Sequence, residues 1–213
     1  MYFLPRHFPQ ALLKHCSTFT MTKKQEKSVN ALLRLYITGG TKGHPWNTAK
    51  WEFRNFVDPS QADSEYGGNT MRSVKSAQCG KRPVAGGVEH VCLQFEGSDF
   101  MRGQVRRMAG LVIMLIQGRN RGRPEDIIAA ALRGDPNIQP PLAPAHYVIL
   151  ERPNYPADKA AALPKEGWSD NYSKQQIESF RSRVLMPHLG SPKGLQASCQ
   201  WMLMLHEATQ FGG

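Results

Sequence analysis

The sequence has few cysteines, no long apolar run and a shortage of acidic residues, and the first two of these each exclude a class of protein. Its four cysteines, Cys16, Cys79, Cys92 and Cys199, lie far apart with no Cys-x-x-Cys spacing, which excludes zinc ribbons, thioredoxin chemistry and a dense disulfide framework. The longest apolar run covers residues 111–116, whereas a membrane-spanning helix needs about 20 such residues. We therefore expect a protein of a reducing compartment that is not an integral membrane protein.

Basic residues outnumber acidic ones along the chain. Its 213 residues carry 27 Lys and Arg against 17 Asp and Glu, which gives a net charge of +10. An excess of this size favours a polyanionic partner, and solubility alone explains it less well. The length leaves room for one ordinary domain or two small ones.

The first 25 residues have the composition of an organellar presequence, because they contain no acid before Glu26 and are rich in hydroxyl side chains. This composition predicts a mitochondrial protein, with a nuclear or cytoplasmic location as alternatives. The competing interpretation is an ordinary extended start to a domain. The residues concerned are Arg6, Lys14, Lys23 and Lys24, with Ser17, Thr18, Thr20 and Thr22.

Local patterns in the first half of the chain predict one helix and two strands. A capping box at residues 22–25 and helical spacing of apolar residues predict a helix over 23–37 that ends at Gly39-Gly40. Alternating patterns predict antiparallel strands near 71–79 and 88–96, with loops at 41–50 and 58–70. In the second strand Val91, Leu93 and Phe95 would pack, whereas His90, Cys92, Gln94 and Glu96 would form a polar face.

The second half predicts mainly helices. Residues from 100 to about 116 are dense enough in apolar side chains for a central buried helix, and Pro124 and Gly134 bound a shorter one. Residues 145–152 read as a strand. A second capping box, Ser173 to Gln176, predicts a helix whose apolar positions are Ile177, Phe180 and Val184.

Arginines are concentrated around the predicted central helix. Between Asp99 and Glu125 there is no acid but there are six arginines, and on a helix residues 102 and 106 share a face that 107 flanks. Arginine suits phosphate because its planar fork engages two oxygens. The alternative is a solvated helix face with a basic end. The six are Arg102, Arg106, Arg107, Arg119, Arg121 and Arg123, and a second basic cluster comprises Arg72, Lys75, Lys81 and Arg82.

The run Phe100-Met-Arg-Gly-Gln-Val-Arg-Arg-Met-Ala-Gly-Leu-Val-Ile113 resembles the central helix signature of the TruA family of tRNA pseudouridine synthases. The match looks closest to the eukaryotic multi-site branch. Further segments resemble the family in the right order, over roughly residues 1–155, with a weaker echo at 180–187. They are Tyr2-Phe-Leu-Pro5, Phe53-Arg-Asn-Phe56, Gly118-Arg119, Pro124-Glu125, Ala143-Pro144 and Leu150-Glu-Arg152.

The resemblance implies an α/β (α+β) fold with an antiparallel sheet and packed helices, one half of a pseudo-symmetric pair that grips RNA between its halves. Residues 1–156 would form this half domain, and 157–213 a helical extension packed on it. The family detaches uracil from C1′ of a flipped-out uridine, rotates it and rejoins it through C5, with one essential Asp and no cofactor. Metal catalysis is not expected, because none of the seven histidines pairs with another ligand at a recognised spacing.

Carried over onto this sequence, Arg106 matches the arginine that pairs with and orients the catalytic Asp. The resemblance places Arg102, Arg107 and the segment Phe53, Arg54, Asn55 and Phe56 near the RNA path. The remaining RNA-binding candidates come from the basic clusters and are Arg119, Arg121, Arg123, Arg72 and Lys75.

The departures from the family pattern concern its catalytic group and its pocket. The family's Asp belongs to an Arg-Thr-Asp motif, and this tripeptide does not occur in the sequence. Gly103 stands where many relatives have His, residues 42–50 form an insertion, and His146-Tyr147 replaces a small-then-leucine pattern. Asp99 is close to the central helix in sequence, but its backbone position is not that of the family's Asp.

Three functions follow as alternatives. The chain is the RNA-gripping half of an isomerase whose Asp-bearing half is a separate polypeptide or an unsequenced part of the gene. Alternatively, it is a catalytically inactive structural or assembly factor of a ribonucleoprotein such as an organellar ribosome. The third possibility is a basic protein–protein module without an RNA role. The first two predict RNA binding whose affinity falls with salt.

Overall fold

The computed structural model describes residues 2–5, 21–39, 50–80, 84–85, 88–118, 122–151 and 171–207. Most of the presequence-like segment and of the 42–50 insertion lies outside these residues, as do Arg119, Arg121, Lys81 and Arg82. No helix of the described part combines the length and the apolar character that crossing a bilayer requires.

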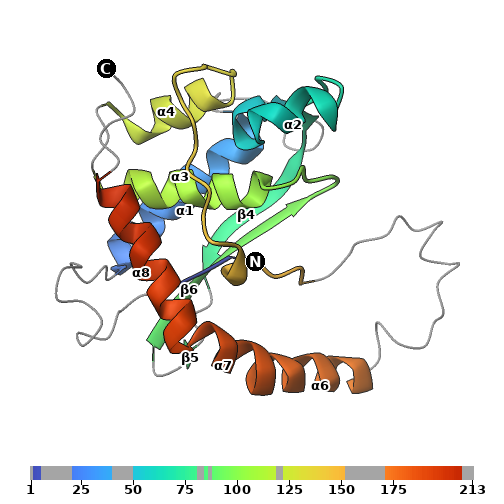
Figure 1. Cartoon of the computed structure of the whole chain (residues 1–213), viewed down its shortest axis with the longest axis vertical. Coiled ribbons are helices and arrows are strands. Elements are labelled where there is room, and N and C mark those ends of the chain that lie inside the picture. Colours follow the sequence, from blue (N-terminus) through green and yellow to red (C-terminus); the bar gives the residue numbers. More distant parts are fainter. Residues whose placement is uncertain are drawn as a thin grey trace, which may run out of the picture.

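A four-stranded antiparallel sheet forms the centre of the fold (Figure 1). Its longest strand, β6 (Val88–Gly97), pairs with β1 (Tyr2–Pro5) on one side and with β4 (Val74–Gly80) on the other. The short strand β5 (Val84–Ala85) pairs with the start of β6, and β2 (Trp51–Glu52) pairs with β3 (Met71–Arg72) in a separate ladder. The predicted α+β class with an antiparallel sheet and packed helices is confirmed.

The expected polar face of the second strand is wrong over its first half. His90 and Cys92 are as fully buried as Val91 and Leu93, because β6 is an inner strand and Tyr147 covers its other side, with its ring centroid 6.0 Å from that of His90. A strand alternates between buried and exposed side chains only where one face of the sheet is packed, and here both faces of β6 are covered.

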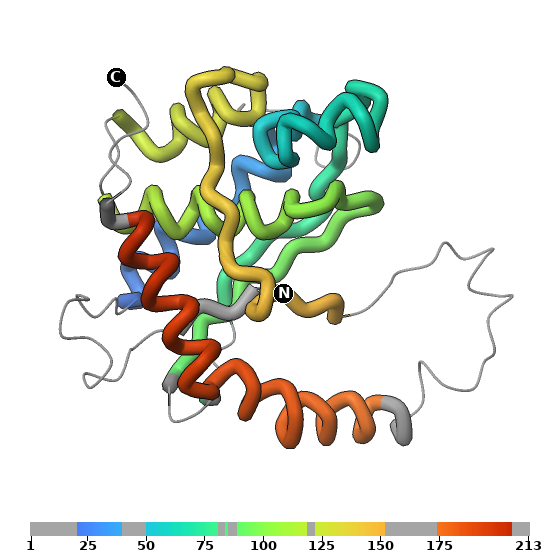
Figure 2. Tube along the Cα trace, viewed as in Figure 1, coloured from blue at the N-terminus to red at the C-terminus, as the bar shows by residue number. Residues whose placement is uncertain are grey.

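The helix α1 (Lys23–Thr38) forms where its capping signals predict it. The Gln25 N–H donates to the Thr22 hydroxyl, the Thr22 N–H donates to the Gln25 side chain, and Gly39 ends the helix with a φ of 62°. A glycine at this place adopts the left-handed conformation without a steric penalty. The helix packs against β4 and lies behind α3 in Figure 2.

The central helix α3 (Gln104–Ile116) is buried as predicted but begins later than residue 100. Gly103, with a φ of 79°, precedes the first helical residue, and the Gln104 side chain accepts from the Met101 N–H at 2.9 Å. Arg102 therefore lies outside the helix, and the predicted face shared by residues 102 and 106 does not exist.

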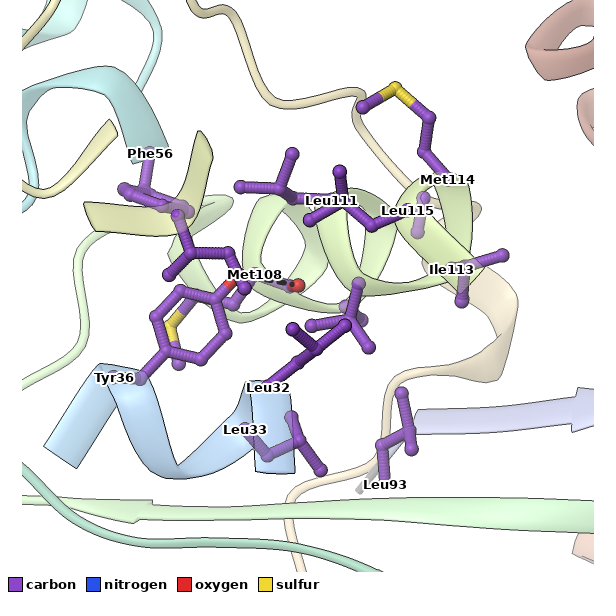
Figure 3. Packing of buried hydrophobic residues seen from close by; sticks show 14 of the residues in the cluster. Leu32, Leu33, Tyr36, Phe56, Leu93, Met108, Leu111, Ile113, Met114 and Leu115 are labelled. Atoms are coloured by element: carbon purple, nitrogen blue, oxygen red, sulfur yellow. Dashed lines mark hydrogen bonds between the residues drawn. The ribbon is translucent and has the colours of Figure 1, made fainter. Parts of the chain in front are cut away.

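The core lies between α1, α3 and the sheet (Figure 3). Figure 3 shows Leu32 and Tyr36 of α1 pointing toward α3, whereas Leu33 lies on the side of the sheet, as does Leu93 of β6. The Tyr36 hydroxyl donates to the Met108 carbonyl at 3.0 Å, so this fully buried hydroxyl has a partner.

Two further elements surround α3. The predicted helix after Pro124 is present as α4 (Pro124–Ala131). The predicted loop at 58–70 contains a short helix, α2 (Pro59–Ser64), whose first turn is capped because the Asp58 carboxylate accepts from the Ser60 N–H at 3.0 Å. Asp-Pro is a helix-start signal as well as a turn signal, which explains why the pattern was misleading.

An extended segment runs from α4 across α3 to η3 (Ala145–Tyr147), a 3-10 turn (Figure 1). The strand predicted over 145–152 is therefore wrong over residues 145–147, which form η3, whereas Val148 makes a single β-bridge. The Val148 N–H donates to the Ala145 carbonyl and closes the turn, so the backbone curls here instead of continuing as an extended strand.

The C-terminal helices are α6 (Asn171–Phe180), the π-helical turn η4 (Arg181–Leu185), α7 (Met186–Leu189) and α8 (Pro192–Glu207). The predicted capping box at 173–176 is wrong, because the helix already begins at Asn171. The apolar positions Ile177, Phe180 and Val184 are about half exposed. By contrast, α8 packs beside α3, and the Gln117 side chain donates to the sulfur of Met202 at 3.4 Å.

Candidate functional site

Arg106 lies on the first turn of α3 and is anchored to the extended segment that follows α4. Its Nε donates to the Ala143 carbonyl at 2.6 Å, and the Ala143 N–H donates in turn to the Arg106 carbonyl at 3.4 Å. The residue is partly buried. Because its side chain and backbone are tied to the same residue, the guanidinium is held in place beside η3.

Gly110, one helical turn after Arg106, permits the close approach of this segment to α3. A Cβ built on Gly110 would lie 2.0 Å from the carbonyl oxygen of Pro141 and 3.0 Å from its carbonyl carbon. Any side chain at position 110 would therefore push the segment away from the helix. The glycine thus determines where the partner of Arg106 lies.

His146 and Tyr147 follow the anchor of Arg106. Burial lowers the pKa of His146 from its ordinary value of 6.5; the Gly194 carbonyl, 3.2 Å from Nε2, opposes this, and the charges of His188 and Arg106 add to it. Burial also raises the pKa of Tyr147 to about 12. Around neutral pH both side chains are therefore uncharged, and Arg106 supplies positive charge beside them.

Arg107 points toward a different part of the same segment. Its Nη1 donates to the Pro140 carbonyl at 2.8 Å, and burial lowers its pKa, an effect that the nearby Asp58 carboxylate opposes. The side chain lines a pocket of about 300 Å³, which Arg54, Asn55 and Gln139 also line. The side chains of the neighbouring residues Arg106 and Arg107 thus contact different parts of the extended segment.

The predicted RNA-contacting segment 53–56 divides into core and surface residues. Phe53 and Phe56 are fully buried and pack edge-to-face at a centroid distance of 5.3 Å, so their side chains cannot reach RNA, contrary to the expectation. Arg54 is about half exposed and pairs with Asp63 at 3.0 Å. Asn55 donates to the Asp135 carbonyl at 2.6 Å. Within the segment 53–56, the residues that line the pocket are Arg54 and Asn55.

Most of the other basic candidates lie on the surface. Arg102 and Arg123 are highly exposed and make ion pairs with Glu65 and Glu125, each at a long 3.9 Å. Lys75 is exposed on β4. Such exposed pairs are weak, so these side chains can turn to a polyanion. Arg119 and Arg121 lie outside the described residues.

Arg72 has a structural environment instead. Its side chain is only 11% exposed, with Nε 3.3 Å from the Asp99 carboxylate and Nη1 donating to the carbonyls of Asn69 and Met71. Its guanidinium also lies 5.5 Å from the ring centre of Tyr66. The expectation that Arg72 follows a phosphate backbone is not supported, because its side chain is mostly buried, its Nη1 donates inside the fold and its charge is paired with Asp99.

The structure identifies site features that the sequence patterns did not indicate. Gln139 lines the pocket of Arg107, the Pro140 carbonyl accepts a hydrogen bond from Arg107, and Asp58 acts on the charge of Arg107. The signal for the segment was its run of prolines, which predicts extended chain but not which helix it crosses. Among the described residues, no cluster of three or more His, Cys, Asp or Glu side chains could hold a metal ion.

These features define an α+β domain whose central helix offers two anchored arginines, an arrangement suited to carboxylates and phosphates. Residues 50–156, half of the chain, match the sequence model of the tRNA pseudouridine synthase family. The chain belongs to this family, the TruA type that its central helix resembles.

Individual relatives agree with this assignment. The chain is 26% identical over 175 residues to tRNA pseudouridine synthase 1 of Yarrowia lipolytica, and 23% over 195 residues to the human pseudouridylate synthase 1 homolog. It is 33% identical over 154 residues to tRNA pseudouridine synthase A of Roseiflexus sp.. These alignments cover 81%, 88% and 72% of this chain but only 30%, 41% and 50% of the three relatives. The chain therefore spans half or less of the length of each.

Proposed function

We propose that this chain is the arginine-bearing half of a TruA-type uridine isomerase that acts on tRNA or rRNA, and that it is active only together with an Asp-bearing half. The observation that carries the proposal is the position of Arg106, fixed by Ala143 within the region that matches the family. The names of the relatives, which are tRNA pseudouridine synthases, support tRNA as the substrate.

The reaction needs no redox partner. The bond between N1 of uracil and C1′ of the ribose breaks, the base rotates, and a bond between C5 and C1′ forms while the C5 proton leaves and N1 gains one. Arg106 would act as a positioning residue, since a guanidinium fixed through Nε keeps the planar orientation that pairing with a carboxylate requires. Its charge would hold the aspartate of the facing half ionised.

The aspartate itself must come from outside this sequence, which contains no Arg-Thr-Asp tripeptide. Its source is a separate polypeptide or another part of the same protein. For this reason we expect the purified chain alone to convert no uridine. RNA contacts would come from the exposed or pocket-lining candidates, namely Arg54, Asn55, Arg102, Arg107, Arg123 and Lys75. A mitochondrial location stays a prediction from the N-terminal composition.

Tritium release tests the proposal directly. A tRNA labelled with tritium at C5 of uridine loses its label to solvent when C5 bonds to C1′. We expect no release with this chain alone and release when a TruA-type half that carries the Arg-Thr-Asp motif is added. The same mixture with Arg106→Ala should release none. Release by the chain alone, or activity of the mixture without Arg106, would refute the assignment.

An inactive structural or assembly factor of a ribonucleoprotein, such as an organellar ribosome, is the second candidate. It is favoured by the environment of Tyr147, which is fully buried and donates to the Leu189 carbonyl at 3.3 Å, so the chain's own C-terminal helices cover this part of the segment beside Arg106. Under this hypothesis RNA still binds, but no Asp-bearing half restores isomerisation. Absence of any salt-dependent RNA affinity would instead favour a protein–protein module.

A further inference from the structure

The proposed isomerisation does not account for the pocket beside Arg107, because Arg106 is not among the residues that line this pocket. We propose that this pocket binds one nucleotide of the RNA, other than the uridine that is isomerised, with the nucleotide's phosphate on Arg107 and its base against the apolar residues of the lining. This inference rests on the proposed function and adds a second point of contact with the RNA.

The charge of Arg107 has no close counter-ion. Among the described residues its guanidinium makes no ion pair within 4.0 Å, and the one hydrogen bond of this group is to the neutral Pro140 carbonyl. Asp58 acts on it only at longer range and is itself engaged, since it accepts from the N–H and the hydroxyl of Ser60. The second arginine of the pocket, Arg54, is already held by Asp63. A half-buried cation without a counter-ion favours an anionic ligand.

The walls of the pocket fit more than a bare anion. Val57, Pro59, Pro136 and Ile138 supply apolar lining, and the arginines and amides supply polar lining. A volume of about 300 Å³ is at the lower end of the range for small-molecule pockets and exceeds what a phosphate group alone fills. A lining that is partly apolar and partly cationic matches a nucleotide, whose flat base and charged phosphate need different surroundings.

Two amides can read the ligand's hydrogen-bonding groups. Gln139 is exposed and makes no side-chain hydrogen bond within the described part of the chain, and Asn55 uses only its N–H, on Asp135. Each therefore keeps an amide oxygen that can accept from a base or a ribose hydroxyl. Because Gln139 supports no other element, it can be changed without disturbing the fold.

The test compares two variants with the same change of charge. Gln139→Glu places a carboxylate at the pocket, whereas Gln175→Glu places one on the exposed surface of α6. Binding of uridine 5′-monophosphate, uridine and inorganic phosphate is measured by calorimetry on the full chain. We expect the monophosphate to bind better than either fragment, and Gln139→Glu to weaken it by about tenfold or more. Gln175→Glu should bind it like the unchanged chain.

The same two variants are then compared in tRNA binding. We expect Gln139→Glu to lower tRNA affinity by several-fold more than Gln175→Glu does. Three results would overturn the proposal: phosphate binding as tightly as the monophosphate, equal effects of the two variants, or loss of monophosphate binding with tRNA affinity intact, which would indicate a site for a free nucleotide. If tRNA binds with normal salt dependence but the pocket fails these tests, the proposed function stands without it; if no RNA binds, both fail.

Discussion

Replacing Gly110 by alanine tests how the arginines of α3 are positioned. In the interior of an exposed helix this change usually stabilises a protein by about 0.5–1 kcal/mol. Here the added Cβ would meet the Pro141 carbonyl oxygen at 2.0 Å, and ordinary contact begins at 3.4 Å. The segment or the helix must therefore move by about 1.4 Å, the difference between these distances. The carbonyl oxygen and carbonyl carbon of Pro141, the two atoms nearest to the added Cβ, belong to the backbone, so no side-chain rotation can relieve the contact.

The displacement has two energetic consequences. Overpacking of this kind costs about 1–3 kcal/mol, and the hydrogen bonds that Arg106 and Arg107 make with the segment would be lengthened, at about 1 kcal/mol or more in total. We expect Gly110→Ala to lower the free energy of unfolding by about 2–4 kcal/mol, measured by urea denaturation. Activity reconstituted with an Asp-bearing half should fall more than stability alone explains.

Gly80→Ala is the matched control. Gly80 ends β4, and a Cβ there would meet nothing within 4 Å, so this variant should be neutral or slightly more stable. If Gly110→Ala proved as stable as Gly80→Ala, the close approach of the segment to α3 would be wrong, and with it the reason for the position of Arg106.

Three other variants examine single interactions. Arg106→Ala should lower the free energy of unfolding by about 1–2 kcal/mol in urea titrations, and the exposed Arg183→Ala by almost nothing; equal losses would contradict the anchoring role. Tyr36→Phe removes the hydrogen bond to the Met108 carbonyl and should lower the free energy of unfolding by about 1 kcal/mol, measured by thermal unfolding. An unchanged unfolding temperature would contradict this hydrogen bond. The depressed pKa of His146 means that the unfolded state binds its proton more readily, so stability falls as pH drops below about 6.5. His146→Asn should reduce this loss between pH 7.5 and pH 5.5, and an unaltered pH dependence would exclude His146 as its source.

The family and several elements could be predicted from the sequence because their signals are local. The capping box of α1, the proline and glycine that bound α4, and the arginine pair of the central helix each lie within a few residues of the feature that they determine. The order of matching segments also indicated the family before any distance was known. The same order of segments made Arg106 the candidate for the catalytic arginine, which stays a prediction.

The parts that could not be predicted depend on contacts between distant segments. That Phe53 and Phe56 belong to the core, and that Arg72 is held by Asp99, follows from which elements pack together rather than from any spacing. The start of α3 was misplaced because Gly103 reads like any other residue of an apolar run until its left-handed backbone is seen.

The sequence by itself determined that this chain is a basic α+β domain of the tRNA pseudouridine synthase family, since residue identity and short-range order suffice for that. Only the tertiary structure decided where each arginine lies and what it contacts. Arg106 and Arg107 are neighbours in sequence, but successive residues of a helix point about 100° apart, and the segment that crosses α3 at Gly110 gives one of them a place beside η3 and the other a pocket.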